Sequence, residues 1–233
     1  MIQDLPKLKA QLALAVRLLY LENLIDFNGH VSVRVQDRVY INARPISRAA
    51  VQAKHIVAVN LNGEQVEGDL EPPGETALHT AIYRSRADVM SVAHLHPHHV
   101  TVLGIAQEKI VPVFILGSIF ADGVPVYDDP DLIFTHTQGD AVAETLGAAR
   151  AAVLRGHGAV VVGVSLEETF AASVYLEENA KKQYAASTLG KPRAFTPDEA
   201  RRVRTSLWKP KTVQKVWDFY VSKGRVLGVL ADE

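Results

Sequence analysis

The stretch AAVLRGHGAVVVGV, residues 151–164, decides the fold that we expect for this chain. Residues 151–154 and 159–164 are short runs of small and β-branched apolar residues, which is typical of buried strands. Between them a Gly-His-Gly triplet holds His157, and glycine adopts backbone angles that other residues avoid. The stretch therefore predicts two strands of one sheet, with a histidine at the tight junction between them.

Working outward, the chain alternates between helical and extended patterns. Ser165 is an N-cap, and Glu168 three residues later completes a capping box, which predicts a helix to about residue 188. Residues 89–96 form an apolar strand that Pro97 ends. The other expected elements are helices over 5–24, 75–86, 98–105 and 140–146, strands over 31–35, 38–41 and 56–60, short strands and loops over 107–137, and two helices after Thr196 and Pro210.

These elements predict one α/β domain over residues 1–233, in which helices cover a mixed or antiparallel sheet. We expect the C-terminal helices to start at about residue 196. Neither an internal repeat nor a linker divides the chain.

Composition excludes several classes of function. The net charge is −1 without a basic run, so we expect no nucleic-acid partner. Without cysteine, the chain forms no disulfide and offers no thiolate to a metal. No apolar stretch is long enough for a membrane span or resembles a signal peptide, so the expected location is the cytoplasm.

Histidines carry the clearest chemical signal. Side chains alternate along a strand, so His94 and His96 point the same way and can share a metal ion. A His-X-His pair alone is weak, because chance gives roughly 0.35 per chain of this composition, against roughly 0.04 for Gly-His-Gly. His157 is therefore the third expected ligand, and three protein ligands with an open position indicate a catalytic metal. His98 and His99, at the next helix, are expected to line the pocket or to be structural.

A catalytic carboxylate is expected at Glu75, which begins the helix just before the histidine strand. The alternative role for Glu75 is to complement the helix dipole, which is common at helix starts. His79 lies one turn further on, on the same helix face.

Taken together, these residues resemble the class II aldolase/adducin family. The resemblance covers roughly residues 8 to 185 and rests on an ordered set of motifs, which are Gly29-His30-Val31-Ser32, Glu75 with its helix, Ala93-His94-Leu95-His96, Arg155-Gly156-His157-Gly158 and 162–168.

The resemblance implies an α/β/α sandwich around a mainly antiparallel sheet. It implies that His94, His96 and His157 hold one divalent metal ion and that Glu75 is the acid/base of a carbon–carbon lyase. It also implies a homotetramer with active sites at subunit interfaces. By ligand type zinc is the expected ion, with manganese or another divalent ion as the alternative.

The chain departs from the sugar-phosphate aldolases of that family at the positions that bind phosphate. His30 replaces an asparagine, residues 42–47 read NARPIS, and Pro73-Gly74 replaces two serines. Proline offers neither an N–H nor a hydroxyl group. We therefore expect a small unphosphorylated carboxylate as the substrate.

The same departures suggest the residues that bind this carboxylate. Arg44 offers a guanidinium for bidentate binding, and His30 offers a proton or a hydrogen bond. The segment around Asn28 and Gly29 resembles a branch of the family that decarboxylates hydroxylated aromatic or pyridine dicarboxylates. We expect Asn28, Gly29 and Arg44 to contact the substrate, although a surface position is the alternative for Arg44.

The expected function is thus decarboxylation of a hydroxyaromatic acid, in which the metal, a Lewis acid, stabilises developing negative charge. Retro-aldol cleavage or epimerisation of a hydroxy-carbonyl or sugar-derived compound is the alternative. A non-catalytic, adducin-like scaffold is a third class, but the chain keeps all three metal histidines and Glu75.

Overall fold

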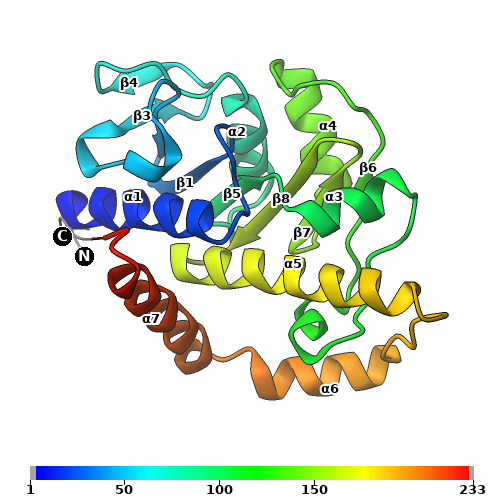
Figure 1. Ribbon diagram of the computed structural model, residues 1–233. Coiled ribbons are helices and arrows are strands. Elements are labelled where there is room, and N and C mark those ends of the chain that lie inside the picture. The colour runs from blue at the N-terminus through cyan, green and yellow to red at the C-terminus, as the bar shows by residue number, and fades with distance from the viewer. Residues whose placement is uncertain (1–3, 231–233) are drawn as a thin grey trace.

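An eight-stranded sheet forms the centre of the computed structural model, which describes residues 4–230 (Figure 1). The strand order is β4-β3-β2-β1-β5-β8-β7-β6, and every neighbouring pair is antiparallel except β6 and β7. The strands are β1 (His30–Val35), β2 (Arg38–Asn42), β3 (Ile56–Asn60), β4 (Gln65–Glu67), β5 (Ser91–Leu95), β6 (Val126–Tyr127), β7 (Ala151–Leu154) and β8 (Gly158–Gly163).

Helices cover both faces of this sheet. The α-helices are α1 (Leu5–Leu21), α2 (Thr76–Ser85), α3 (His98–Ile105), α4 (His136–Leu146), α5 (Leu166–Ser187), α6 (Pro197–Leu207) and α7 (Pro210–Val226). Apolar residues of α2 and α4 share one core cluster with β7 and β8, and those of α1, α3, α5 and α7 share the other. The expected three-layer arrangement around a mainly antiparallel sheet is confirmed.

The central strands β5 and β8 are buried along their whole length. Burial on both faces explains why the sequence of residues 158–163 is continuously apolar instead of alternating. The two strands pair in register, with His94 opposite Val160. The end of β5 and the start of β8 therefore meet at one edge of the molecule's central layer, and this edge holds the histidines.

Gly158 makes this meeting possible. A Cβ atom at this position would lie 2.1 Å from the carbonyl oxygen of Leu95, which no side chain tolerates. The neighbouring Gly156 has φ +67°, in the region that favours glycine. The backbone therefore requires glycine at both positions of the triplet, and His157 lies on the tight turn between them.

Several expected elements differ in detail from the structure. The helix predicted from Glu75 begins at Thr76, the strand predicted to reach His96 ends at Leu95, and the helix predicted from 140 begins at His136. Strand β4 was not expected, because a run of three residues carries no periodicity. Of the short strands expected over 107–137, the structure has β6, whereas Ile115–Phe120 form a 3-10 helix.

The predicted capping box at the start of α5 is half formed. The side chain of Ser165 accepts a hydrogen bond from the backbone N–H of Glu168, as expected. The carboxylate of Glu168 instead pairs with Arg150, which neutralises it more effectively than a backbone amide would. None of the helices in the described residues is both long and apolar enough to cross a membrane.

Candidate active site and metal centre

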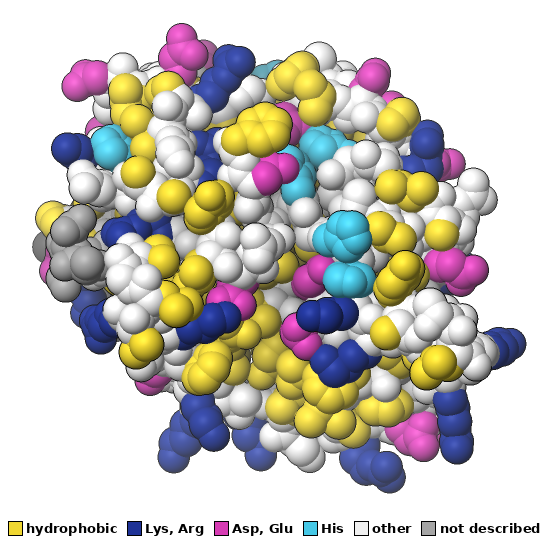
Figure 2. Space-filling view, viewed as in Figure 1, with side chains coloured by type: hydrophobic (Ala, Val, Ile, Leu, Met, Phe, Trp, Pro, Cys, Tyr) yellow, Lys and Arg dark blue, Asp and Glu magenta, His cyan; other side chains and the backbone are white. Residues whose placement is uncertain are grey.

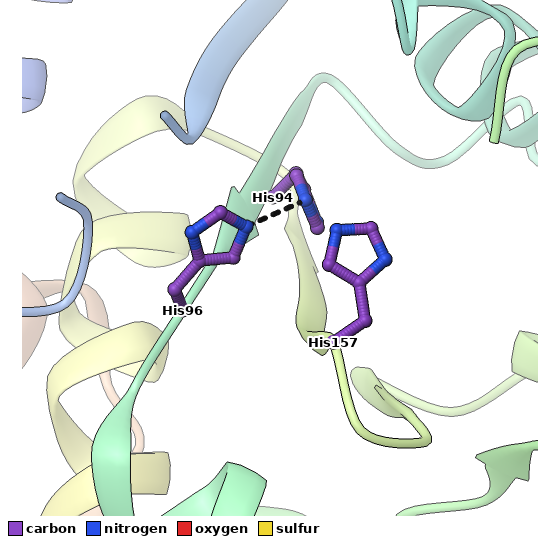
Figure 3. A group of neighbouring side chains, drawn as sticks. All are labelled: His94, His96 and His157. Atoms are coloured by element: carbon purple, nitrogen blue, oxygen red, sulfur yellow. Dashed lines mark hydrogen bonds between the residues drawn. The ribbon is translucent and has the colours of Figure 1, made fainter. Parts of the chain in front are cut away.

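Three histidines from two neighbouring strand ends point toward one another (Figure 3). His94 is the fourth residue of β5, and His96 follows the end of that strand. His157 comes from the turn between β7 and β8. We call His94, His96 and His157 the metal histidines. Each offers a ring nitrogen, and these three nitrogens lie within 4.8 Å of one another.

The spacing of these nitrogens fits a metal ion. His94 Nε2 lies 3.2 Å from His96 Nε2 and 3.4 Å from Glu75 Oε2. Ligand atoms at about 2.0–2.1 Å from a tetrahedral zinc ion are separated from each other by roughly 3.3–3.4 Å. The His94–His96 pair is therefore already at the separation that coordination requires, and His157 lies in the same cluster.

The outer ring nitrogens of two metal histidines show why a cation belongs here. His94 Nδ1 lies 3.2 Å from the carbonyl oxygen of Ala159, and His96 Nδ1 lies 3.2 Å from Asp26 Oδ2. Both partners only accept, so each Nδ1 carries the proton and each neutral ring directs its Nε2 lone pair inward. Two lone pairs facing each other at 3.2 Å repel unless a positive charge lies between them.

Glu75 lies at the centre of this group rather than at the surface of its helix. It is the N-cap of α2, but its side chain makes no capping hydrogen bond. Its carboxylate accepts a hydrogen bond from the backbone N–H of Ile133 at 3.0 Å, and its other oxygen faces His94. The second oxygen also lies 3.7 Å from His30 Nε2. Complementing the helix dipole is therefore not its main contact.

The surroundings of Glu75 keep it ionised. Burial by itself raises the pKa of this carboxyl, but the neighbouring imidazoles of His30 and His94 outweigh burial and hold the pKa below its ordinary value. Burial also lowers the pKa of His157 to about 4, so this imidazole is neutral at pH 7. A carboxylate among neutral imidazoles can take up a proton and can support a cation.

An open cavity leads to the metal histidines. It encloses about 590 Å³, and its lining includes His96 and His157 together with Asn28, His98 and several apolar side chains. Figure 2 shows histidines gathered near the centre of this face among hydrophobic side chains. The cavity is large enough for a small organic molecule, and two of the metal histidines, His96 and His157, line it.

The structure brings some of the expected substrate residues to this cavity. Asn28 lines it, and His30 is buried behind it, against His94, with ring centroids 4.9 Å apart. Gly29 has φ +85°, and a Cβ there would lie 2.6 Å from Ile25 Cγ2, so glycine is required for the backbone to turn. His98 lines the cavity, whereas His99 bonds to Glu177 at the start of α3.

Arg44 lies elsewhere. Its side chain is 68% exposed and its nearest acidic group is Glu71, at 3.9 Å. The neighbouring Arg48 is buried and donates to the carbonyl oxygens of Gly29, Ala43 and Ile46. Within one copy of the chain, neither arginine reaches the cavity, and substrate binding by Arg44 stays a prediction.

Sequence reasoning missed two sets of partners. Asp26 orients His96, and nothing in the local pattern around residue 26 marks it. His30 is hydrogen-bonded to His79, His79 to Ser32, and Ser32 to Tyr83, at distances of 2.7 to 2.8 Å. The position of His79 one turn after Glu75 was visible in the sequence, but its partners on β1 are distant along the chain.

Comparisons with known proteins agree with this site. The chain is 31% identical over 186 residues to 3,4-dihydroxyphthalate decarboxylase of Terrabacter sp. (strain DBF63), covering 74% of this chain and 78% of the relative. It is 32% identical over 142 residues to L-fuculose phosphate aldolase of Escherichia coli K12, covering 60% and 65%. A solved aldolase II superfamily protein from Pseudomonas syringae superposes with a TM-score of 0.87 at 21% identity, covering 98% and 96%.

The two curated relatives are lyases, one a decarboxylase and the other an aldolase. Class II aldolases use a divalent metal ion, and the metal histidines with Glu75 form a cluster that can bind one. The sequence profile of the class II aldolase and adducin N-terminal domain matches residues 10–184. This chain therefore belongs to the class II aldolase and adducin family.

Proposed function

We propose that this protein is a metal-dependent carbon–carbon lyase that decarboxylates a small hydroxyaromatic carboxylate. The observation that carries the proposal is the convergence of the metal histidines, with Glu75 beside His94, next to an open cavity that His96 and His157 line. The 31% identity to a dihydroxyphthalate decarboxylase supports the substrate class. The few free donors in the segments 42–47 and 73–74 and the apolar wall of the cavity also favour it.

The segments that replace the phosphate-binding residues offer few donors to an anion. The backbone N–H groups of Ala43 and Arg44 donate to carbonyl oxygens of His55 and Glu71, so they are already used. The carbonyl oxygen of Pro73 accepts from Thr76, and a Cβ on Gly74 would lie 2.8 Å from Phe134. These contacts leave fewer amides free in the two segments for a phosphate group.

The cavity wall suits a flat apolar ring. Phe27, Ile105 and Leu132 line it, and they are 81%, 63% and 49% exposed in one copy of the chain. Ligand sites are mostly apolar with a few placed polar groups. An aromatic ring against these side chains would direct its oxygen substituents toward the metal histidines.

Glu75 and His30 have separate roles in the proposed reaction. Loss of carbon dioxide leaves the electron pair of the broken bond on the ring carbon, which must then receive a proton. Glu75, ionised in the resting site, takes the proton of the substrate hydroxyl and returns it to that carbon. His30 directs a ring nitrogen toward the same carboxylate and donates a hydrogen bond to a substrate oxygen. One proton from solvent is consumed in each turnover.

The divalent ion supplies a Lewis acid that stabilises the negative charge on substrate oxygens. Three histidine ligands favour zinc, and manganese is the alternative, because affinity order alone does not determine which metal is selected. We also propose a homotetramer in the cytoplasm, in which neighbouring copies complete the open cavity. Sedimentation of the purified protein tests the assembly.

Retro-aldol cleavage is the second candidate. Identity of 32% over 142 residues to a fuculose phosphate aldolase favours it, and the same metal and carboxylate serve both reactions. The missing donors for phosphate argue against a phosphorylated sugar, so this candidate takes an unphosphorylated hydroxy-carbonyl compound.

One assay separates the two candidates. Purified protein loaded with zinc or with manganese is given a panel of hydroxyaromatic carboxylates and hydroxy acids, and both carbon dioxide and aldehyde are measured. We expect carbon dioxide only, and a loss of about 10²–10⁴-fold in Glu75→Gln, which keeps the shape but removes the base. Aldehyde as the sole product would refute the decarboxylase.

A further inference from the structure

A continuous line of buried hydrogen bonds runs from His30 into the core. His30 Nδ1 lies 2.7 Å from His79 Nε2, and His79 Nδ1 lies 2.7 Å from Ser32 Oγ. Ser32 Oγ lies 2.8 Å from the hydroxyl of Tyr83. All four residues are buried, and none is a metal histidine. We call His30, His79, Ser32 and Tyr83 the buried histidine chain.

The hydroxyl of Tyr83 sets the direction of this chain. Burial raises the pKa of Tyr83 above its ordinary value, so the phenol keeps its proton. Among the described residues, the hydrogen-bond acceptor placed for that proton is Ser32 Oγ. A hydroxyl that accepts from Tyr83 directs its own proton to its other partner, which is His79 Nδ1.

The two histidines continue the same direction. A neutral imidazole that accepts at Nδ1 carries its proton on Nε2, so His79 donates from Nε2 to His30 Nδ1. His30 then accepts at Nδ1 and carries its proton on Nε2. That nitrogen lies 3.7 Å from Glu75 Oε2, where an N–H is attracted and a lone pair would be repelled. The contacts at both ends of the buried histidine chain therefore require the same direction of hydrogen-bond donation, from Tyr83 toward His30.

We propose that His79, with Ser32 and Tyr83 behind it, is a positioning residue that locks His30 in the tautomer with its proton on Nε2. His30 thereby always presents an N–H, never a lone pair, to Glu75 and the substrate. This inference rests on the proposed function for the part that His30 plays at the substrate. The tautomer itself follows from the contacts of the buried histidine chain.

Two substitutions at residue 79 distinguish positioning from packing. In His79→Gln the amide N–H₂ replaces Nε2–H as the donor to His30, whereas in His79→Leu the volume stays and the donor disappears. We expect His79→Leu to lower kcat by roughly tenfold or more, because a misplaced tautomer removes the working hydrogen bond. KM and bound metal stay near those of the unaltered protein, and His79→Gln restores most of kcat.

Nitrogen NMR reads the tautomer without any turnover. Zinc-loaded protein labelled with ¹⁵N-histidine is compared with His30→Gln, which identifies the His30 signals, and with His136→Gln, an exposed histidine, as the matched control. We expect His30 protonated on Nε2 in the unaltered protein and in His79→Gln. A mixture of tautomers is expected in His79→Leu and also in Ser32→Ala, which tests the same chain if His79→Leu does not fold.

The outcomes separate this inference from the proposed function. His30 protonated on Nδ1 in the unaltered protein, or one tautomer shared by every variant, overturns the inference even if carbon dioxide is released. Failure to decarboxylate any member of the panel, with His30 held on Nε2, overturns the proposed function and leaves the positioning role of His79 standing. An equal loss of kcat in His79→Leu and His79→Gln, without a change of tautomer, means that residue 79 only packs.

Discussion

Two groups of histidines meet at Glu75, and their hydrogen bonds give them opposite properties. In the metal histidines, acceptors hold the outer nitrogens of His94 and His96, so the inner lone pairs face one another. In the buried histidine chain, His30 Nδ1 and both ring nitrogens of His79 each have a hydrogen-bonding partner. Histidine is thus a candidate metal ligand in one group and part of a line of hydrogen bonds in the other.

The largest expected effect comes from removing a metal histidine. His157→Ala takes away one of three ligands, and we expect the purified variant to lose bound metal and to fall to the activity of the metal-free protein. The buried histidine chain does not touch residue 157, so the fold and the His30 tautomer should remain. Elemental analysis and the carbon dioxide assay measure bound metal and activity, with His136→Ala as the control. Full retention of metal in His157→Ala would contradict its assignment as a metal ligand.

Acid is expected to destabilise the metal-free protein through one histidine of each group. Burial lowers the pKa of His30 and of His157 to about 4, from the ordinary value of 6.5. The unfolded chain therefore binds more protons than the folded chain between these values, so the free energy of unfolding falls as pH decreases through this window. The lowered pKa of Glu75 acts in the same direction at more acidic pH.

Urea unfolding in the presence of a chelator, at about pH 7.5, 6 and 5, measures this slope. His157→Ala should make the slope smaller, because it removes one of the histidines whose pKa burial lowers. A stability that stays constant or rises toward acid pH would contradict the neutral state of both imidazoles.

A smaller effect is expected at Asp26, the carboxylate that orients His96. Loss of such an outer partner typically weakens metal affinity by about 10–100-fold. Asp26→Ala should therefore raise the dissociation constant for zinc, whereas Ser32→Ala, in the buried histidine chain, should leave it unchanged. Competition with a zinc indicator measures both affinities. Equal affinities in the two variants would contradict a role of Asp26 in metal binding.

The smallest effect is expected at Arg44, because it lies outside both groups of histidines. Its exposed pairing with Glu71 contributes little, so we expect Arg44→Ala to change the free energy of unfolding by less than about 0.5 kcal/mol. KM should change by less than about twofold, as is usual for surface substitutions without a partner. A tenfold rise in KM would instead bring Arg44 to the substrate through a neighbouring copy of the chain.

Sequence reasoning anticipated the features that depend on local pattern. The apolar runs around Gly156-His157-Gly158 predicted two strands and a histidine at their junction, and the structure has both. The alternation of His94 and His96 predicted side chains on one face, and their ring nitrogens lie 3.2 Å apart. Strand β4 was not predicted, because three residues hold no period.

The sequence by itself determined the family and the candidate ligands and led to the prediction that Glu75 is the acid/base, because these depend on residue type and spacing along single strands and turns. Only the tertiary structure decided which ring nitrogen of each histidine is free. That choice depends on partners far along the chain, such as Asp26 for His96 and His79 for His30. A lone pair is directed by whatever holds the opposite nitrogen, and such contacts exist only after strands β1 and β5 and helix α2 pack together.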